Sequence, residues 1–435
     1  MIINYYLKNY KFLVIYFLFF FIPKIKLGND IYIWPFEPFM ILFILYFLFI
    51  GGEIVLDKVL LYPIIFFVYL LILSFFHISL QNYSFSLGEF LRNIKMLLYF
   101  VFQLFMFSYL FKKYRDRNII FDILKLYVFF ASLIMVVMLA QIFYFFIKNG
   151  IPSPLEIIWN VNSNYKPYLY QGRYITNEGL KDIEKGNLNS TGILSVLVFF
   201  ISGYLLKKNH SKFFFISKII SLVTLLLSFS RSSFVVFILM LFFYIFTLDK
   251  TINKLKSLLY IILVVSTLLL FFQDILNFTI FSKIQLTIES SQNNDLEVSS
   301  ATRVGMWEYF FSGKPNYFNL LLGNGFGSSG VLYFTNNRYS QLESLFLNNL
   351  VWAGVISFLF LYYYYIIIKR AKYLKLYNTD LFKIFFFFFI FYLLPNTFTG
   401  GDFLIDSSLH YLFPIIFIIF YNYKWIKNEN FVINC

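Results

Sequence analysis

The sequence has few of the residues that build disulfide frameworks, metal centres and soluble surfaces. Its one cysteine, Cys435, excludes an internal disulfide and any cysteine-based metal site. Charged residues make up 13% of the chain and hydrophobic residues 60%, whereas a soluble globular domain is about one quarter charged. The chain also has no Walker A, HExxH or Gly-x-Ser-x-Gly motif. The P-loop ATPase, zinc protease and serine hydrolase classes therefore have no support in the sequence.

Long, continuous apolar runs are what the sequence does contain, for example over residues 39–50 and 260–272. A strand of a membrane β-barrel alternates apolar and polar residues, whereas a transmembrane helix needs about 20 mostly apolar residues in a row. The runs therefore predict an all-α polytopic membrane protein, with residues 1–435 forming a single integral membrane domain. We expect about twelve transmembrane helices, near residues 9–23, 35–50, 59–78, 94–111, 126–147, 189–206, 213–229, 232–248, 257–273, 345–368, 382–395 and 409–422.

The loops between these segments differ in charge and in length. On one side of the membrane, the loops and both termini hold 22 of the 36 basic residues and 7 of the 22 acidic ones. The positive-inside rule predicts that this side is cytoplasmic. The net charge of +14 is then a topology signal, and no nucleic acid partner is expected. Two external loops are long, over 149–188 and 274–344, which predicts that the outer face carries the activity.

Three polar features have two interpretations each. The stretch from Gly325 to Gly330 matches G-x-G-x-x-G, but a dinucleotide site needs a preceding strand and a following helix, so a tight turn beside a substrate site is favoured. Asp295 and Glu297 resemble a metal-chelating pair within a Ser/Asn-rich stretch that is typical of a solvated loop. His77 and His410 both fall near predicted outer ends of helices and are candidates for a shared site.

External arginines are the more informative candidates. Arg231 lies in a short polar turn between two apolar helices, either as an interfacial residue that snorkels or as a guanidinium fork for phosphate. Arg173, Arg303 and Arg338 are further external arginines, and together they predict an anionic ligand at the outer leaflet. Glu343 begins a predicted helix, where it either stabilises the helix N-terminus or acts as a general base.

Four stretches in this order resemble the bacterial O-antigen polymerase and O-antigen ligase superfamily of polysaccharide-assembly membrane enzymes. They cover roughly residues 186–356, and the helix layout extends the likeness over the chain. The stretches are Gly186-Asn-Leu-Asn-Ser-Thr-Gly192, Ser230-Arg-Ser-Ser233, Arg303-Val-Gly-Met-Trp307 followed by Leu322-Gly-Asn-Gly-Phe-Gly327, and Glu343-Ser344 followed by Gly354-Val-Ile356.

This resemblance implies an enzyme of the bacterial cytoplasmic (inner) membrane that uses glycans on undecaprenyl diphosphate, with neither cofactor nor metal. Ligases of the superfamily carry a histidine where this chain has Glu343, so the resemblance favours a repeat-unit polymerase of O-antigen or capsular polysaccharide. It implies Glu343 as base, with Arg231 and Arg303 on the diphosphate. The expected substrate-binding residues are Arg173, Arg338, Asn189, Trp307 and Tyr309.

Two other functions stay open from the sequence. The first is an O-antigen ligase, which transfers finished polymer to lipid A core or to protein. The second is a non-enzymatic flippase or transporter of the same lipid-linked glycans, although such folds often show internal repeats and mid-membrane charges. The partners expected in the main case are the lipid-linked oligosaccharide and the bilayer, and a chain-length regulator is a candidate partner.

Overall fold

The computed structural model describes most of the predicted helical segments but only parts of the two long loops. Its described residues are 10–22, 24–26, 32–33, 35–80, 87–114, 118–149, 173–175, 188–228, 230–247, 259, 321–325, 345–395, 415–416, 418–419 and 422–423. Its helices include α2 (Lys11–Phe21), α3 (Phe36–Phe49), α4 (Lys58–Leu80), α5 (Leu87–Lys113), α6 (Asn118–Asn149), α8 (Leu188–Asn209), α9 (Lys212–Leu227), α10 (Arg231–Phe246), α15 (Leu345–Ala353), η4 (Gly354–Phe358), α16 (Leu359–Tyr377), α17 (Thr379–Phe388) and η5 (Phe389–Leu393).

The helices confirm the predicted class of a helical membrane protein. Four of the helices in the described part of the chain are long and apolar enough to cross a bilayer, and a bent pair forms a fifth candidate. These four candidate membrane spans are Lys58–His77, Ile94–Lys113, Ile119–Tyr144 and Thr191–Asn209. Shorter apolar helices cover Lys11–Phe21, Phe36–Phe49 and Ser232–Ile245. The count of twelve spans and the assignment of the basic side to the cytoplasm stay predictions.

Several helices extend beyond the apolar runs that predict them. The segment expected near 94–111 begins at Leu87, and the segment expected near 126–147 begins at Asn118. The added turns hold charged residues, Glu89 and Arg92 in α5 and Asp122 and Lys125 in α6, which interrupt the apolar runs. Side-chain caps mark other helix starts, since Ser211 accepts from Phe213 N at 3.3 Å and Asn378 from Leu381 N at 3.0 Å.

The segment expected as one helix over 345–368 is broken. Helix α15 ends at Ala353, a 3₁₀ turn follows, and Asn349–Phe358 is bent by 60° from Leu361–Leu376. Gly354 lies at the break with φ +56°, a left-handed conformation that favours glycine. The contacts that fix this break come from residues 321–325 and are described with the site.

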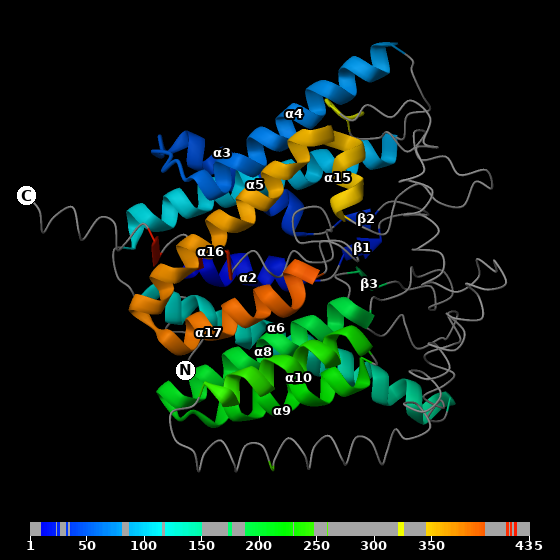
Figure 1. Cartoon of the computed structure of the whole chain (residues 1–435). Helices are drawn as coiled ribbons and strands as arrows, with labels where there is room; N and C mark the ends of the chain where they lie inside the picture. The colour runs from blue at the N-terminus through cyan, green and yellow to red at the C-terminus, as the bar shows by residue number, and fades with distance from the viewer. Residues whose placement is uncertain are drawn as a thin grey trace, which may run out of the picture.

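A small three-stranded sheet accompanies the helices, which the sequence did not predict. Strand β1 (Lys24–Lys26) pairs antiparallel with β2 (Tyr32–Ile33) and parallel with β3 (Arg173–Ile175), in the order β2-β1-β3. The sheet ties part of the loop over 149–188 to the connection between α2 and α3. In Figure 1 the labelled strands lie at the same end of the helix bundle as α15.

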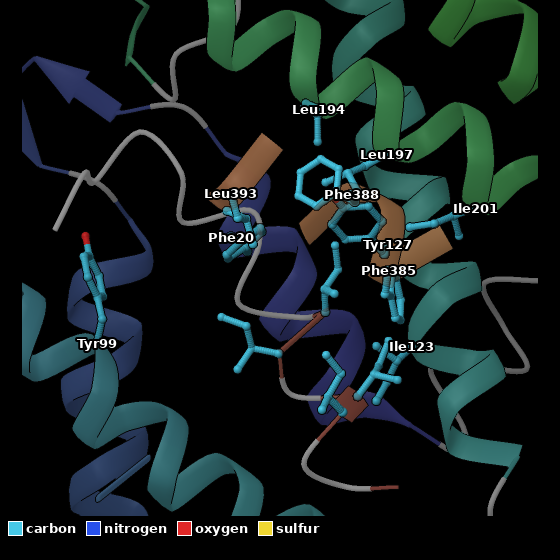
Figure 2. Packing of buried hydrophobic residues seen from close by; sticks show 14 of the residues in the cluster. Phe20, Tyr99, Ile123, Tyr127, Leu194, Leu197, Ile201, Phe385, Phe388 and Leu393 are labelled. Carbon is cyan, nitrogen blue, oxygen red and sulfur yellow. The ribbon is translucent and has the colours of Figure 1, made fainter. Parts of the chain in front are cut away.

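The apolar core joins helices that are far apart in the sequence. Figure 2 shows buried side chains of α2, α6, α8 and α17 gathered around one another. Aromatic rings fill much of this core, and Tyr127 lies edge-on to Phe21 with ring centroids 5.6 Å apart. The labelled members of the cluster include Phe20, Ile123, Tyr127, Leu194, Leu197, Ile201, Phe385, Phe388 and Leu393.

Helix α8 packs closely against α9, and both helices bury small hydroxyl side chains. Ser195 and Ser202 of α8 are buried, as are Ser217, Ser221 and Thr224 of α9. Small residues allow two helix backbones to approach closely where no hydrophobic force drives them together in lipid. The pair α8–α9 therefore forms a compact hairpin that supports the start of α10.

Candidate functional site

The predicted site residues differ in how much of them the structure describes. Glu343, Arg303, Arg338, Trp307 and Tyr309 lie outside the described residues. Asn189, Arg173 and Arg231 have described backbones, in α8, β3 and α10 respectively. Their surroundings show how the described parts of the four stretches of the resemblance are arranged. Two further candidates, the Asp295–Glu297 pair and His410, also lie outside the described residues.

Residues 321–325 of the predicted major external loop dock onto the end of α15 through backbone hydrogen bonds. Asn324 N donates to Val351 O at 2.9 Å, and Gly325 N donates to Trp352 O at 2.8 Å. These carbonyls belong to the last turn of α15, where helical carbonyls lack intrahelical partners. The loop residues therefore cap the helix and hold its break at Gly354 in place.

Two glycines make this close approach possible. Gly323 and Gly325 have φ values of +81° and +75°. A Cβ on Gly323 would collide with the backbone at Trp352 and Ala353. On Gly325 it would lie 2.6 Å from Ser74 N of α4. Gly323 and Gly325 are therefore packed against α15 and α4 with no room for a Cβ at either position, while the tight turn expected over Gly325–Gly330 stays a prediction. The Phe326–Gly330 part of the G-x-G-x-x-G match lies outside the described residues.

Helix α4 forms the second wall of this turn. Tyr69 donates its hydroxyl to Leu322 O at 2.6 Å, and Ser74 donates to Leu70 O at 2.6 Å. His77, near the end of α4, hydrogen-bonds to the backbone of Gly323. The structure thus brings His77 to the turn, whereas His410 lies outside the described residues and the shared histidine site stays a prediction.

Buried polar groups gather where the turn meets α15. Asn324 and Asn349 are 1% and 2% exposed. Among the described residues, Oδ1 of Asn349 has no hydrogen-bond partner. A buried amide oxygen without a hydrogen-bond partner is costly in an apolar setting. Asn349 is therefore a further candidate residue of the site. Asn349 was not among the predicted site residues, although a polar residue within an apolar helical segment is a signal that could have selected it.

A second joint connects the starts of α8 and α10. A Cβ on Gly192 would lie 2.5 Å from Ser233 Oγ and 2.9 Å from Ser230 Cβ, so the two helices touch at this glycine. Ser230 caps α10, with its Oγ accepting from Ser233 N at 3.3 Å and donating to Ser233 Oγ at 2.7 Å. The first two stretches of the resemblance are therefore in direct contact.

Arg231 is the first residue of α10. The N-terminus of a helix carries a partial positive charge, so a cation there is unfavourable unless an anion is near. Helix N-termini are in general common anion sites. The position of Arg231 is therefore suited to an anion and has no benefit for the helix itself.

Arg173 occupies the parallel strand pair, in register with Lys24 of β1. The structure thus places the backbones of two basic residues, one from each of two predicted external loops, side by side. In the view of Figure 1 the strands lie between α15 and the layer of α8, α9 and α10. Gly192 of the first stretch contacts Ser230 and Ser233 of the second, and Gly323 of the third lies against Gly354 of the fourth.

Comparisons with known proteins add no relative: no protein-family model, no curated protein and no solved structure matches the chain. Within the described part of the chain, no group of three or more His, Cys, Asp or Glu residues is placed to hold a metal ion.

Proposed function

We propose that this protein is a polymerase that joins undecaprenyl-diphosphate-linked oligosaccharide repeat units into O-antigen or capsular polysaccharide on the outer face of the cytoplasmic membrane. The observation that carries the proposal is that the described parts of the four stretches meet in two pairs: Gly192 against Ser230 and Ser233, and the 323–325 turn against the break at Gly354. The Gly323–Gly325 turn fixes the end of α15, and Glu343 precedes the first residue of α15 by two positions.

The chemistry needs few parts because the donor is already activated. The acceptor hydroxyl oxygen forms a bond to the anomeric carbon of the donor sugar, and the bond from that carbon to the diphosphate breaks. The lipid diphosphate leaves with the electron pair, while Glu343 takes the hydroxyl proton as general base. No nucleotide is consumed.

Arginines supply the electrostatic part of the proposal. Arg231 and Arg303 stabilise the charge that grows on the departing diphosphate, since a guanidinium fork binds phosphate oxygens in a bidentate manner. Arg173 and Arg338 give supporting contacts together with Asn189, while Trp307 and Tyr309 stack on sugar faces.

The surface glycans of cells carrying single substitutions test the proposal. Arg231→Ala, Arg303→Ala and Glu343→Gln, at unchanged membrane levels, should leave single repeat units on the acceptor and no long chains. Lys314→Ala, in the same predicted loop as Arg303, is the matched control and should keep full-length polymer. A bare acceptor in the first three variants would instead indicate a ligase. Full-length polymer with Arg231→Ala or Arg303→Ala would refute the diphosphate assignment.

A further inference from the structure

A second candidate binding site lies on the seam between α4 and α16, and it does not depend on the proposed function. The two helices contact each other and run beside each other in Figure 1. The rings of Tyr62 and Tyr362 meet edge-on across the seam with centroids 5.8 Å apart. An ion pair joins Asp57, the residue before α4, to Arg370 of α16.

The basic end of the seam holds a cavity of about 420 Å³. Lys58, Lys369 and Arg370 line it, together with the tyrosines Tyr365, Tyr373 and Tyr423. The buried carboxylate of Asp57 offsets the charge of Arg370. Lys58 and Lys369 are exposed and leave an excess of two positive charges at the cavity. The cavity therefore suits a phosphate group, with tyrosine hydroxyls as additional donors.

The other end of the same seam is apolar. A groove of about 190 Å³ is lined by Tyr62, Pro63, Ile65 and Phe66 of α4 and by Leu359 and Tyr363 of the facing segment. From Lys58 to Phe66 the helix rises by roughly 12 Å. Within that distance the seam changes from a cationic cavity to an apolar groove, which is the order of groups along a phospholipid from its headgroup to its acyl chains.

We infer that the α4–α16 seam binds an anionic phospholipid, with the phosphate in the cavity beside Lys58 and Lys369 and an acyl chain in the groove beside Ile65 and Leu359. Basic pockets between transmembrane helices on the cytoplasmic side are known to bind anionic lipid headgroups. A soluble phosphate would use the cavity alone, whereas a phospholipid uses both halves of the seam.

Native mass spectrometry of the full chain in detergent tests the headgroup half. The probe is phosphatidylglycerol, with phosphatidylcholine as the neutral comparison. Each lysine near a charged lipid contributes about a fivefold gain in affinity, so Lys58→Gln with Lys369→Gln should weaken phosphatidylglycerol binding about 30-fold. The matched control is Lys372→Gln with Lys375→Gln, two exposed lysines on α16 that do not line the cavity. Unchanged binding in the first pair, or an equal loss in both pairs, would overturn the site.

A second pair of variants tests the groove and separates a lipid from a soluble anion. Ile65→Trp fills the groove and should weaken phosphatidylglycerol binding at least about fivefold, a loss that corresponds to about one buried methylene group. Ile72→Trp, at an exposed position of α4 outside the groove, should leave binding unchanged. Glycerophosphate at equal concentration should not displace the lipid. Displacement by glycerophosphate, or no effect of Ile65→Trp, would show that the ligand is a soluble anion and refute the lipid site.

Discussion

The two ends of the broken helix α15–η4–α16 are held by different chemistry. At the α15 end, the backbone of residues 321–325 docks onto the carbonyls of Val351 and Trp352 through glycines that leave no space for a side chain. At the α16 end, the buried side chain of Arg370 forms an ion pair with the buried carboxylate of Asp57, which lies in a loop far away in the sequence. The first joint depends on backbone shape and the second on charge, so different substitutions should break them.

The largest effect is expected at the buried ion pair. Arg370→Met leaves the carboxylate of Asp57 buried without this cation and should lower the free energy of unfolding by about 3–5 kcal/mol. Adding Asp57→Asn removes the second charge, keeps an oxygen acceptor for Val59 N, and should restore most of that loss. Denaturant unfolding in mixed micelles measures both variants, with the exposed Lys372→Met as control. If the double variant is no more stable than Arg370→Met, the ion pair does not hold this end.

The docked turn gives the next largest effect. Gly323→Ala should cost about 2–4 kcal/mol, because a left-handed backbone and a collision with the α15 backbone both oppose the methyl group. Gly51 also has positive φ, at +62°, but a Cβ there would meet open space. Gly51→Ala should therefore cost only the backbone part, about 1–2 kcal/mol. Equal losses in the two variants would mean that the turn is not docked as described.

Two glycines of α8 sharpen the comparison further. Gly192→Ala pushes a methyl group against Ser233 and should destabilise by about 1–3 kcal/mol. At Gly203 the nearest heavy atom to an added Cβ is 3.9 Å away. Gly203→Ala should stabilise the helix by up to about 1 kcal/mol. Denaturant unfolding measures the free energy of unfolding of both variants. Stabilisation by Gly192→Ala would contradict the close contact of α8 with α10.

The smallest effect belongs to a half-exposed ion pair. Lys207 and Asp380 lie 3.7 Å apart with side chains 51% and 44% exposed. Such pairs couple by less than about 1 kcal/mol, and salt screens them. A double-mutant cycle with Lys207→Met and Asp380→Asn should give a coupling in that range that falls at high salt. A coupling above about 2 kcal/mol would show that this pair acts like the buried one.

Hydropathy predicted the helices because a transmembrane segment must satisfy its backbone internally, and a continuous apolar run permits only that. The runs near 35–50 and 59–78 became α3 and α4 within two residues at each end. The sheet could not be predicted in this way, since strands of two or three residues carry no periodicity. Hydropathy also did not predict the break at Gly354. The residues that bond to the helix at this break are Asn324 and Gly325, some thirty residues earlier in the chain.

The order of the four stretches predicted which segments belong to one site, but not which of them touch. Contact between Gly192 and Ser233, or between Gly323 and Trp352, depends on how whole helices pack. The sequence marks Asn349 as a polar residue within an apolar segment, but its burial depends on the tertiary structure.

Chain extension by the purified protein tests the central claim most directly. Full-length protein in lipid nanodiscs is given lipid-linked repeat units with no nucleotide and no metal added. The account predicts a ladder of products longer by whole repeat units, one undecaprenyl diphosphate released for each bond formed, and loss of the ladder with Glu343→Gln. Release of no diphosphate and recovery of only single repeat units from the wild-type protein would contradict it.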